Sequence, residues 1–263
     1  MDRILILDFG GQTAQLIGRR IRDFEVYSEI VPGDRDIKAI IDSDVRGIIL
    51  SGSPDSAWVA GAPAPDAAIF DIDLPVLGIC YGFHQLVLAD GGEVLSLGYR
   101  EYGRAPVSVL LDELLFDGIP REFMSWMSHG DSVVTLGGGY EPIGISKNGT
   151  VAAARSLNKQ FWGVQFHPEI SHCEHGLRLL ENFVCGICHA GREWNLENFV
   201  KQECLKLQEE VGDEDVLLLI SGGVDSTVVA ALLLKALGAE RVWLMYVDTG
   251  LMRKDEGEEV EDI

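Results

Sequence analysis

The residue with the clearest chemical potential is Cys80, which lies between two glycines in the stretch GICYG at 78–82. The apolar run 74–79 before it predicts a buried strand, and residues 83–89 after it predict a helix. Glycines on both sides permit the sharp turn of a nucleophile elbow. A thiol at the amino end of a helix is favoured as the thiolate, because the helix dipole is positive there. A buried structural cysteine beside a tight turn is the alternative interpretation.

A thiol nucleophile needs a general base, and the base needs a group that orients it. The stretch FHPE at 166–169 offers both, since His167 and Glu169 follow a strand predicted to end at Gln165. Pro168 disfavours a helical conformation at His167, so we expect an extended or turned segment in which Glu169 orients the imidazole. Such a segment alone is more often an ordinary loop, but its combination with the Cys80 turn favours catalysis.

The stretch SGGVDS at 221–226 indicates a second chemistry. It lies between an apolar strand pattern at 216–220 and a helical pattern that runs to Leu237. Its glycines permit close approach to a phosphate chain, and its N–H groups and hydroxyls can surround an anion at the amino end of the helix. It lacks the Gly-Lys-Ser/Thr ending of a Walker loop. A serine-rich helix start without a ligand is the alternative.

The elements around Cys80 predict how these stretches are positioned. Strand patterns occur at residues 3–8, 26–30, 47–51 and 76–79. Helical patterns such as 13–24 separate them, which is typical of a parallel sheet wrapped by helices. Ligands of such sheets gather beyond the carboxyl ends of the strands. We therefore expect the turns at 8–12 and 51–54 to face the same edge as Cys80.

From about residue 93 the pattern changes to shorter β-rich segments, which predict an added antiparallel layer. These segments lie at 105–110, 151–155 and 161–165. A helix at 174–189 is expected to close the first domain, and a polar amphipathic helix at 193–210 to lead to the second unit. A second strand pattern of that unit lies at 242–247.

The predicted fold class is α/β, with a mixed, mostly parallel sheet flanked by helices and the first strand-helix-strand of a second doubly wound α/β domain. The predicted boundaries are 1–190 for the first domain, 191–212 for a linker helix and 213–263 for the second domain. One strand-helix-strand unit is too small to bury a sheet on both faces. We therefore expect the chain to be a fragment of a longer protein.

Composition narrows the class of protein. The chain has 263 residues, 47% of them hydrophobic, and a formal net charge of -21. Such a charge argues against nonspecific binding to nucleic acid or to an anionic membrane. The amino terminus lacks the apolar core of a signal peptide, and no apolar stretch approaches the roughly 18 residues of a membrane span. Five cysteines without a secretory context make a disulfide framework unexpected. We expect a cytoplasmic protein.

Together the stretches GICYG at 78–82 and GVQFHPE at 163–169 resemble class I glutamine amidotransferases. The stretches ILILDFG at 4–10, MSHGD at 127–131 and SGGVDS at 221–226 narrow the resemblance to the glutamine-hydrolysing GMP synthase family. The resemblance implies glutamine, ATP and XMP as substrates, Mg²⁺ accompanying ATP, and a homodimer in the full-length protein. It implies no permanently bound cofactor, and it places the XMP site downstream of this chain.

The resemblance also implies roles for individual residues. Cys80 attacks the side-chain amide of glutamine, His167 carries the proton to the departing ammonia, and Glu169 holds His167. The implied oxyanion-hole residues are Ser53 and Tyr81, and the implied glutamine-binding residues are Gly52, His84, Ser128 and His129. The 221–226 stretch resembles the pyrophosphate loop of ATP pyrophosphatases. The implied ATP-binding residues are Ser221, Gly222, Gly223, Val224, Asp225, Ser226 and Val247, with Asp225 as a candidate Mg²⁺ ligand. The segment 247–250 is similar to the family segment near the nucleotide.

Two positions depart from the family pattern. Ser53 replaces a glycine, and a serine there costs about 1 kcal/mol or more if the position requires a positive φ. His84 stands where the family carries a glutamine that helps to hold the substrate, and Gln85, about 100 degrees further round the helix, cannot simply substitute. These departures leave an alternative function open. The chain is then a non-catalytic or ammonia-dependent regulatory module with impaired glutamine binding.

Overall fold

The computed structural model describes residues 1–247, apart from the side chains of Leu97 and Tyr99. The chain divides into two compact units, Met1–Trp194 and Asn195–Ile263. Each unit has its own sheet.

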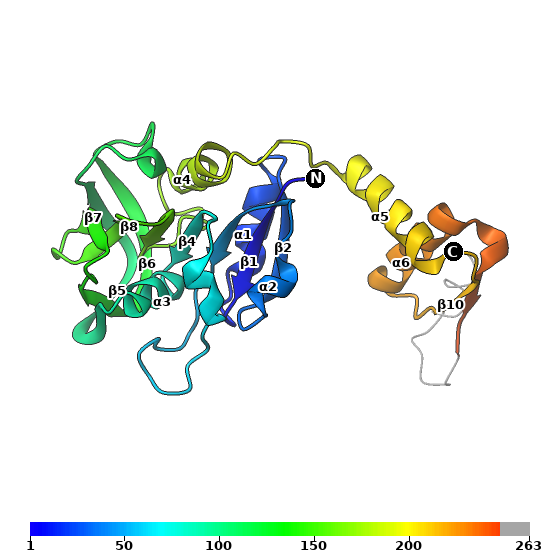
Figure 1. Ribbon diagram of the computed structural model, residues 1–263, viewed down its shortest axis with the longest axis horizontal. Helices are drawn as coiled ribbons and strands as arrows, with labels where there is room; N and C mark the ends of the chain where they lie inside the picture. Colours follow the sequence, from blue (N-terminus) through cyan, green and yellow to red (C-terminus); the bar gives the residue numbers. More distant parts are fainter. Residues whose placement is uncertain (248–263) are drawn as a thin grey trace. The chain divides into compact units, whose positions relative to one another are not determined.

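The first unit is built on one nine-stranded sheet with the order β2-β1-β3-β4-β9-β8-β7-β5-β6 (Figure 1). The parallel strands are β2 (Tyr27–Pro32), β1 (Arg3–Asp8), β3 (Val45–Leu50), β4 (Val76–Ile79) and β9 (Phe161–Val164). The antiparallel strands are β8 (Val151–Ser156), β7 (Tyr140–Ser146), β5 (Glu93–Val109) and β6 (Glu122–Thr135). The mixed sheet is confirmed, but the antiparallel strands extend the same sheet and do not form an added layer.

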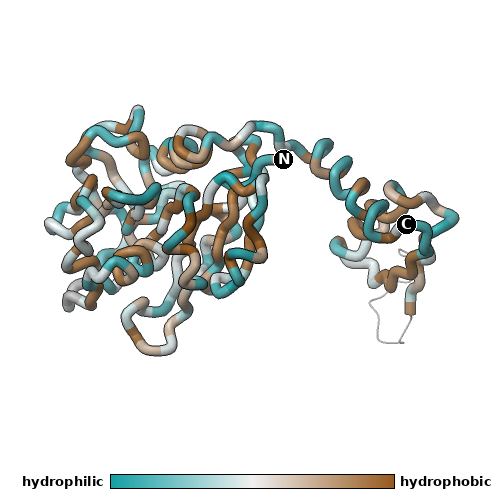
Figure 2. The backbone as a smooth tube through the Cα atoms, viewed as in Figure 1, coloured by the Kyte–Doolittle hydropathy of each residue, from teal (hydrophilic) through white to brown (hydrophobic). Residues whose placement is uncertain are grey.

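Helices cover both faces of the parallel half, because its strands are apolar at nearly every position. They are α1 (Ala14–Arg22), α2 (Ile37–Ile40), α3 (Tyr81–Ala89), α4 (Gly176–Glu181) and the 3₁₀ turns Ala67–Asp71 and Leu114–Phe116. In β1, Ile4 and Ile6 pack in the core that contains α1 and α4, whereas Leu5 and Leu7 pack in the core that contains α3. Alternate side chains of one strand thus fill two cores. In the first unit, the parallel strands run along hydrophobic stretches of the chain (Figure 2).

The predicted closing helix is present but not uniform. After α4 the helix continues as a π-helical stretch, Asn182–Ile187, and this helical segment ends at Cys188. Cys188 packs directly on Gly47 of β3, where a side chain would collide with its sulfur. The five cysteines are free.

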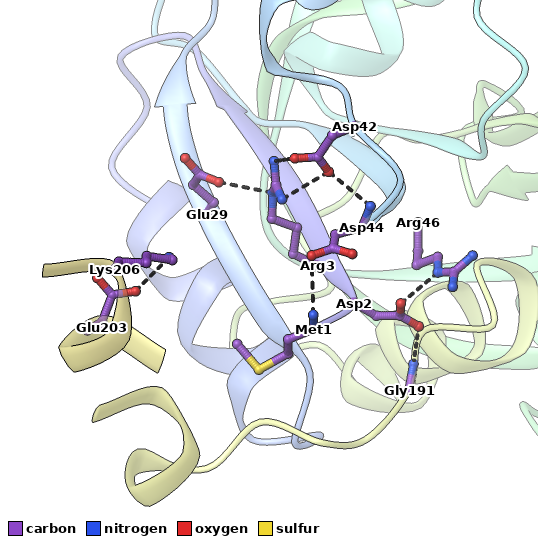
Figure 3. Close-up of polar contacts among 10 residues, drawn as sticks. All are labelled: Met1, Asp2, Arg3, Glu29, Asp42, Asp44, Arg46, Gly191, Glu203 and Lys206. Carbon is purple, nitrogen blue, oxygen red and sulfur yellow. Dashed lines mark hydrogen bonds and ion pairs between the residues drawn. The ribbon is translucent and has the colours of Figure 1, made fainter. Parts of the chain in front are cut away.

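Polar contacts hold the amino ends of the strands (Figure 3). Asp2 accepts hydrogen bonds from Arg46 at 2.8 Å and from the N–H of Gly191 at 2.9 Å, which ties β1 to β3 and to the end of the unit. Arg3 pairs with Glu29 of β2 at 3.1 Å. The carboxyl ends of the same strands, where ligands gather in parallel sheets, lie at the other edge.

The second unit contains the predicted strand-helix-strand. Its elements are α5 (Leu196–Val211), β10 (Val216–Leu219), α6 (Val224–Leu237), the 3₁₀ turn Ala239–Arg241 and β11 (Val242–Met245). β10 and β11 pair in parallel. The Gln208 amide on α5 donates to the carbonyl of Ala236 on α6 at 2.6 Å. The helix predicted as a separate linker at 191–212 therefore packs within the second unit.

Among residues 1–247, the helices are all too short or too polar to span a membrane.

Candidate active site

The turn that carries Cys80 is strained at the cysteine itself. Cys80 has φ 53° and ψ -103° and directly precedes α3. Positive φ costs a non-glycine residue about 1–2 kcal/mol. Its N–H donates to the carbonyl of Val164 on β9 at 2.7 Å, which holds the conformation. The flanking glycines serve close packing, since a Cβ on Gly82 would lie less than 3.0 Å from the backbone of Leu50. A Cβ on Gly78 would lie 2.6 Å from the backbone of Gly82 across the turn, so the elbow is present and its glycines permit the sharp turn, as predicted.

The side chain of His167 lies between Cys80 and Glu169. His167 Nδ1 is 2.8 Å from Glu169 Oε1, and Glu169 is completely buried. Burial lowers the pKa of His167, but hydrogen bonds and charge interactions with Cys80 and Glu169 outweigh it and raise that pKa to about 10. The backbone of His167 is fixed by a hydrogen bond from its N–H to the carbonyl of Trp126 at 2.9 Å. The three side chains therefore form the thiol, imidazole and carboxylate arrangement of a nucleophilic site.

These groups open onto a cavity of about 980 Å³. Its lining includes the predicted residues Gly52, Ser53, Cys80, Tyr81, His84, Ser128, His129 and His167. Glu169 lies behind His167 and does not line the cavity. The turn 10–13 contributes to the wall, as expected for a turn at this edge of the sheet. The structure thus brings together, in one place, side chains that are far apart in sequence.

The turn at 51–54 forms without strain. Ser53 does not have a positive φ, so the cost anticipated for a serine at this position does not arise. Its hydroxyl instead accepts a hydrogen bond from the N–H of Asp55 at 3.2 Å. The N–H of Gly82 donates to the carbonyl of Ser51 at 3.1 Å, which holds the turn beside α3. Tyr81 lies in the first turn of α3, where N–H groups have no acceptor within the helix.

His84 makes a buried contact that sequence reasoning missed. Its Nε2 is 2.7 Å from Oε1 of Gln165, and the amide nitrogen of Gln165 donates to the sulfur of Cys80 at 3.7 Å. Burial lowers the pKa of His84 to about 4, against the opposing effect of the Gln165 bond, so the ring is neutral at pH 7. In the sequence Gln165 ended a predicted strand and belonged to the GVQFHPE stretch, but no local pattern links it to a residue 81 positions away.

His129 has both ring nitrogens facing protein oxygens. Its Nδ1 is 2.8 Å from the carbonyl of Asp131, and its Nε2 is 3.2 Å from Glu101 Oε2. Burial lowers the pKa of His129, although the Asp131 carbonyl and Glu101 act in the opposite direction. Three charged cavity residues, Asp55, Arg100 and Asp131, were not predicted as site residues. Asp131 belongs to the MSHGD stretch, so that motif was the signal that could have identified it.

The loop Ser221–Ser226 of the second unit has the form of an anion cradle. Gly222 has φ +77°, and the hydroxyls of Ser221 and Ser226 lie 3.2 Å apart. Asp225 is exposed in the first turn of α6. Val247 is exposed after β11, while the predicted residues Asp248, Thr249 and Gly250 lie outside the described part of the chain. Within residues 1–247, no group of three His, Cys, Asp or Glu side chains is arranged to hold a metal ion.

Comparison with protein families gives two matches along the chain. Residues 5–187 match the class I glutamine amidotransferase family, and residues 194–261 match the NAD synthase family. The first match covers more than half of the sequence and contains Cys80, His167 and Glu169. The chain therefore belongs to the class I glutamine amidotransferases.

Individual relatives are more specific. The glutamine-hydrolysing GMP synthase of Brachyspira hyodysenteriae is 42% identical over 263 residues, which is 100% of this chain and 51% of that protein. The enzyme of the same name from Bacillus velezensis is 46% identical over 259 residues, which is 98% of this chain and 50% of that protein. The chain thus spans about half the length of the curated relatives it matches.

Solved structures agree on the fold. A putative GMP synthase subunit from Thermoplasma acidophilum superimposes with a TM-score of 0.62 at 29% identity, covering 72% of this chain and 94% of that one. A glutamine amidotransferase from Thermotoga maritima gives a TM-score of 0.53 at 16% identity, covering 81% and 86%. The second likeness concerns the fold alone.

Proposed function

We propose that the first unit hydrolyses glutamine at Cys80 and that, in the full-length protein, the ammonia aminates ATP-activated XMP to give GMP, AMP and pyrophosphate. The observation that carries the glutaminase proposal is the position of His167, which interacts with both the Cys80 thiol and the buried Glu169 carboxylate. The similarity to glutamine-hydrolysing GMP synthases supports the choice of acceptor.

The chemistry begins with a proton transfer. Because Glu169 occupies Nδ1 of His167, the remaining nitrogen Nε2 is the one available to the sulfur of Cys80. This transfer, from the thiol to His167, is complete before glutamine binds at neutral pH, because the pKa of His167 is raised to about 10 and the imidazolium already holds the proton, and the thiolate attacks the carboxamide carbon of glutamine. His167 then gives that proton to the departing ammonia, which leaves a thioester on Cys80. Water hydrolyses the thioester to glutamate, with His167 acting again as the base.

Each tetrahedral intermediate carries an oxyanion that needs N–H donors. The N–H of Tyr81 suits this role, because it lies at the amino end of α3, next to the nucleophile. The backbone of Ser53 in the facing turn is the second candidate, since that turn also lines the cavity. Removal of one such donor costs about 3 kcal/mol of barrier in comparable enzymes.

Substrate recognition needs groups for the α-carboxylate and α-ammonium of glutamine. Arg100 and Asp131 provide opposite charges on the cavity wall, and Gly52, His84, Ser128 and His129 complete the surface near Cys80. We expect Arg100→Leu to raise the KM for glutamine by about tenfold, because a charged hydrogen bond contributes about 1.5 kcal/mol or more.

In the second unit, we propose that the loop Ser221–Ser226 binds the phosphates of ATP. The oxygen-rich donor set of this loop, with the exposed Asp225 carboxylate, fits Mg²⁺, which prefers hard oxygen ligands. Bound Mg²⁺ neutralises charge on the triphosphate. Val247 follows the neighbouring strand β11 and is proposed to lie near the nucleotide. XMP contacts and a homodimer surface are proposed to lie downstream of residue 263.

We further propose a cytoplasmic location, since five free cysteines, among them the proposed nucleophile Cys80, suit a reducing compartment. We propose no role in binding nucleic acid or membranes, in keeping with the net charge of -21.

The test measures glutamate release and GMP formation by the full-length protein supplied with ATP, Mg²⁺ and XMP. We expect Cys80→Ala to abolish glutamate release while GMP formation from added ammonium continues. If the wild-type protein forms GMP from ammonium but releases no glutamate, the ammonia-dependent alternative replaces the glutaminase. If Cys80→Ala leaves glutamate release unchanged, the nucleophile is wrong.

A further inference from the structure

The side-chain amide of Gln165 contacts both the ring of His84 and the sulfur of Cys80, two groups that have separate roles in the proposed reaction. Its oxygen faces Nε2 of His84 at 2.7 Å, and its nitrogen donates to the sulfur of Cys80 at 3.7 Å. Gln165 is 2% exposed and His84 3% exposed, so water does not compete for either bond. The backbone N–H of Gln165 is itself fixed by the carbonyl of Ala152 at 2.8 Å.

The orientation of this amide matters because its two ends have opposite polarity. With the nitrogen toward Cys80, the amide stabilises negative charge on sulfur. With the oxygen toward Cys80, it would repel that charge. A neutral imidazole whose Nε2 carries the hydrogen donates to the Gln165 oxygen and so holds the first orientation. The other groups that influence the charge of His84 are His129 and Asp131 of β6.

We propose that Gln165 is a further catalytic residue, which stabilises the Cys80 thiolate through its amide N–H, and that His84 is its positioning residue. This inference rests on the proposed thiol chemistry. The bond is strongest while the sulfur is an anion, weakens when the sulfur becomes a neutral thioester, and re-forms as glutamate leaves. His84 therefore acts on Cys80 indirectly, by orienting the amide of Gln165, in addition to lining the cavity.

The departure from the family pattern at position 84 then has a physical explanation. A glutamine there could also offer an N–H to the Gln165 oxygen, whereas an apolar residue could not. The exchange between glutamine and histidine preserves the donor. The inference therefore predicts that His84→Gln is tolerated for thiolate formation and that His84→Leu is not.

The experiment measures the rate at which iodoacetamide alkylates Cys80 of the full-length protein across pH 5–10, with the modified peptide identified by mass spectrometry. We expect His84→Leu and Gln165→Leu to move the midpoint of the profile up by about one pH unit and to slow alkylation at low pH about tenfold. His84→Gln should reproduce the wild-type profile.

Gln85→Leu is the matched control, because Gln85 lies on the same helix and bonds to the carbonyl of Pro63 instead of the site sulfur. Gln165→Glu is a near-isosteric second variant if leucine prevents folding. It replaces the donor with an oxygen and should also raise the midpoint. Folded variants with a wild-type profile would overturn the inference. Because alkylation is independent of turnover, this outcome differs from a failure of the glutaminase proposal, in which the wild-type protein releases no glutamate.

Discussion

Replacing Glu169 with glutamine tests the orientation of the base. The substitution keeps the shape of the side chain and removes one negative charge from a position that is completely buried. In the structure Glu169 Oε1 accepts from His167 Nδ1 at 2.8 Å, which fixes the tautomer that leaves Nε2 for Cys80. A glutamine side chain can present either an oxygen or an N–H to that nitrogen, so the tautomer is no longer specified.

The expected fall in the rate of glutamate release follows from the loss of the charged hydrogen bond between Glu169 and His167. A hydrogen bond to a charged group contributes about 1.5–3 kcal/mol, which corresponds to about 10- to 100-fold in rate. Glu169 also raises the pKa of His167 through both its hydrogen bond and its charge, whereas burial lowers it. We therefore expect Glu169→Gln to slow glutamate release 10- to 100-fold and to lower the pKa of His167 from its wild-type value of about 10.

The stability of the protein should change with pH in a defined direction. The folded pKa of His167 lies above its unfolded value of 6.5, so the imidazolium stabilises the fold fully below pH 6.5 and loses this effect as pH rises through about 10. In Glu169→Gln this contribution is smaller. The difference in unfolding free energy between the wild-type protein and the variant should therefore be largest near or below neutral pH and should shrink toward pH 10.

Three measurements check this prediction. NMR titration of the His167 ring gives its pKa, urea unfolding across pH gives stability, and a coupled assay gives glutamate release. Glu122→Gln is the matched control, since Glu122 is exposed at the start of β6. A Glu169→Gln protein with an unchanged His167 titration and a rate within twofold of wild type would refute the assigned role of the carboxylate.

Three further perturbations follow from the packing and charges. Gly82→Ala should lower stability by about 1–3 kcal/mol in a thermal melt, because its Cβ would collide with the backbone of Leu50, whereas Gly138→Ala has open space and should be neutral. The pKa of His84 lies below its unfolded value, so the wild-type protein should lose stability on the order of 3 kcal/mol as pH falls from 6.5 to about 4. His84→Gln should remove this loss. If the variant and the wild-type protein lose stability equally in acid, the burial of a neutral ring is contradicted. Gly222→Ala should weaken Mg²⁺–ATP binding by the full-length protein about fivefold in calorimetry, because φ at that position is +77° and a side chain there costs about 1 kcal/mol; unchanged affinity would separate this loop from the nucleotide.

The parallel half of the fold could be predicted because its signals are local. The apolar runs of β1 and β4 each fill a strand buried by neighbouring helices, and the glycines around Cys80 mark the turn that follows β4. The antiparallel half was less predictable. β5 pairs with both β6 and β7, and the partner of each strand depends on pairings distant in sequence.

At the candidate site, the sequence predicted which residues take part better than it predicted the contacts between them. Cys80, His167 and Glu169 carry recognisable chemistry in short motifs, and the structure brings them together. Gln165 and His84 could not be paired from sequence, because their contact depends on how β9 and α3 pack. Whether a serine is strained at position 53 depends on the backbone φ there, and the sequence does not specify that angle.

The most direct test of the account labels the full-length protein with a chloromethyl ketone analogue of glutamine and locates the adduct by peptide mass spectrometry. The account predicts one adduct per chain, on Cys80, which excess glutamine prevents and which forms much more slowly in His167→Ala. An adduct on another residue, or rapid labelling of Cys80 that does not depend on His167, would contradict the convergence of sulfur and imidazole in one glutamine site.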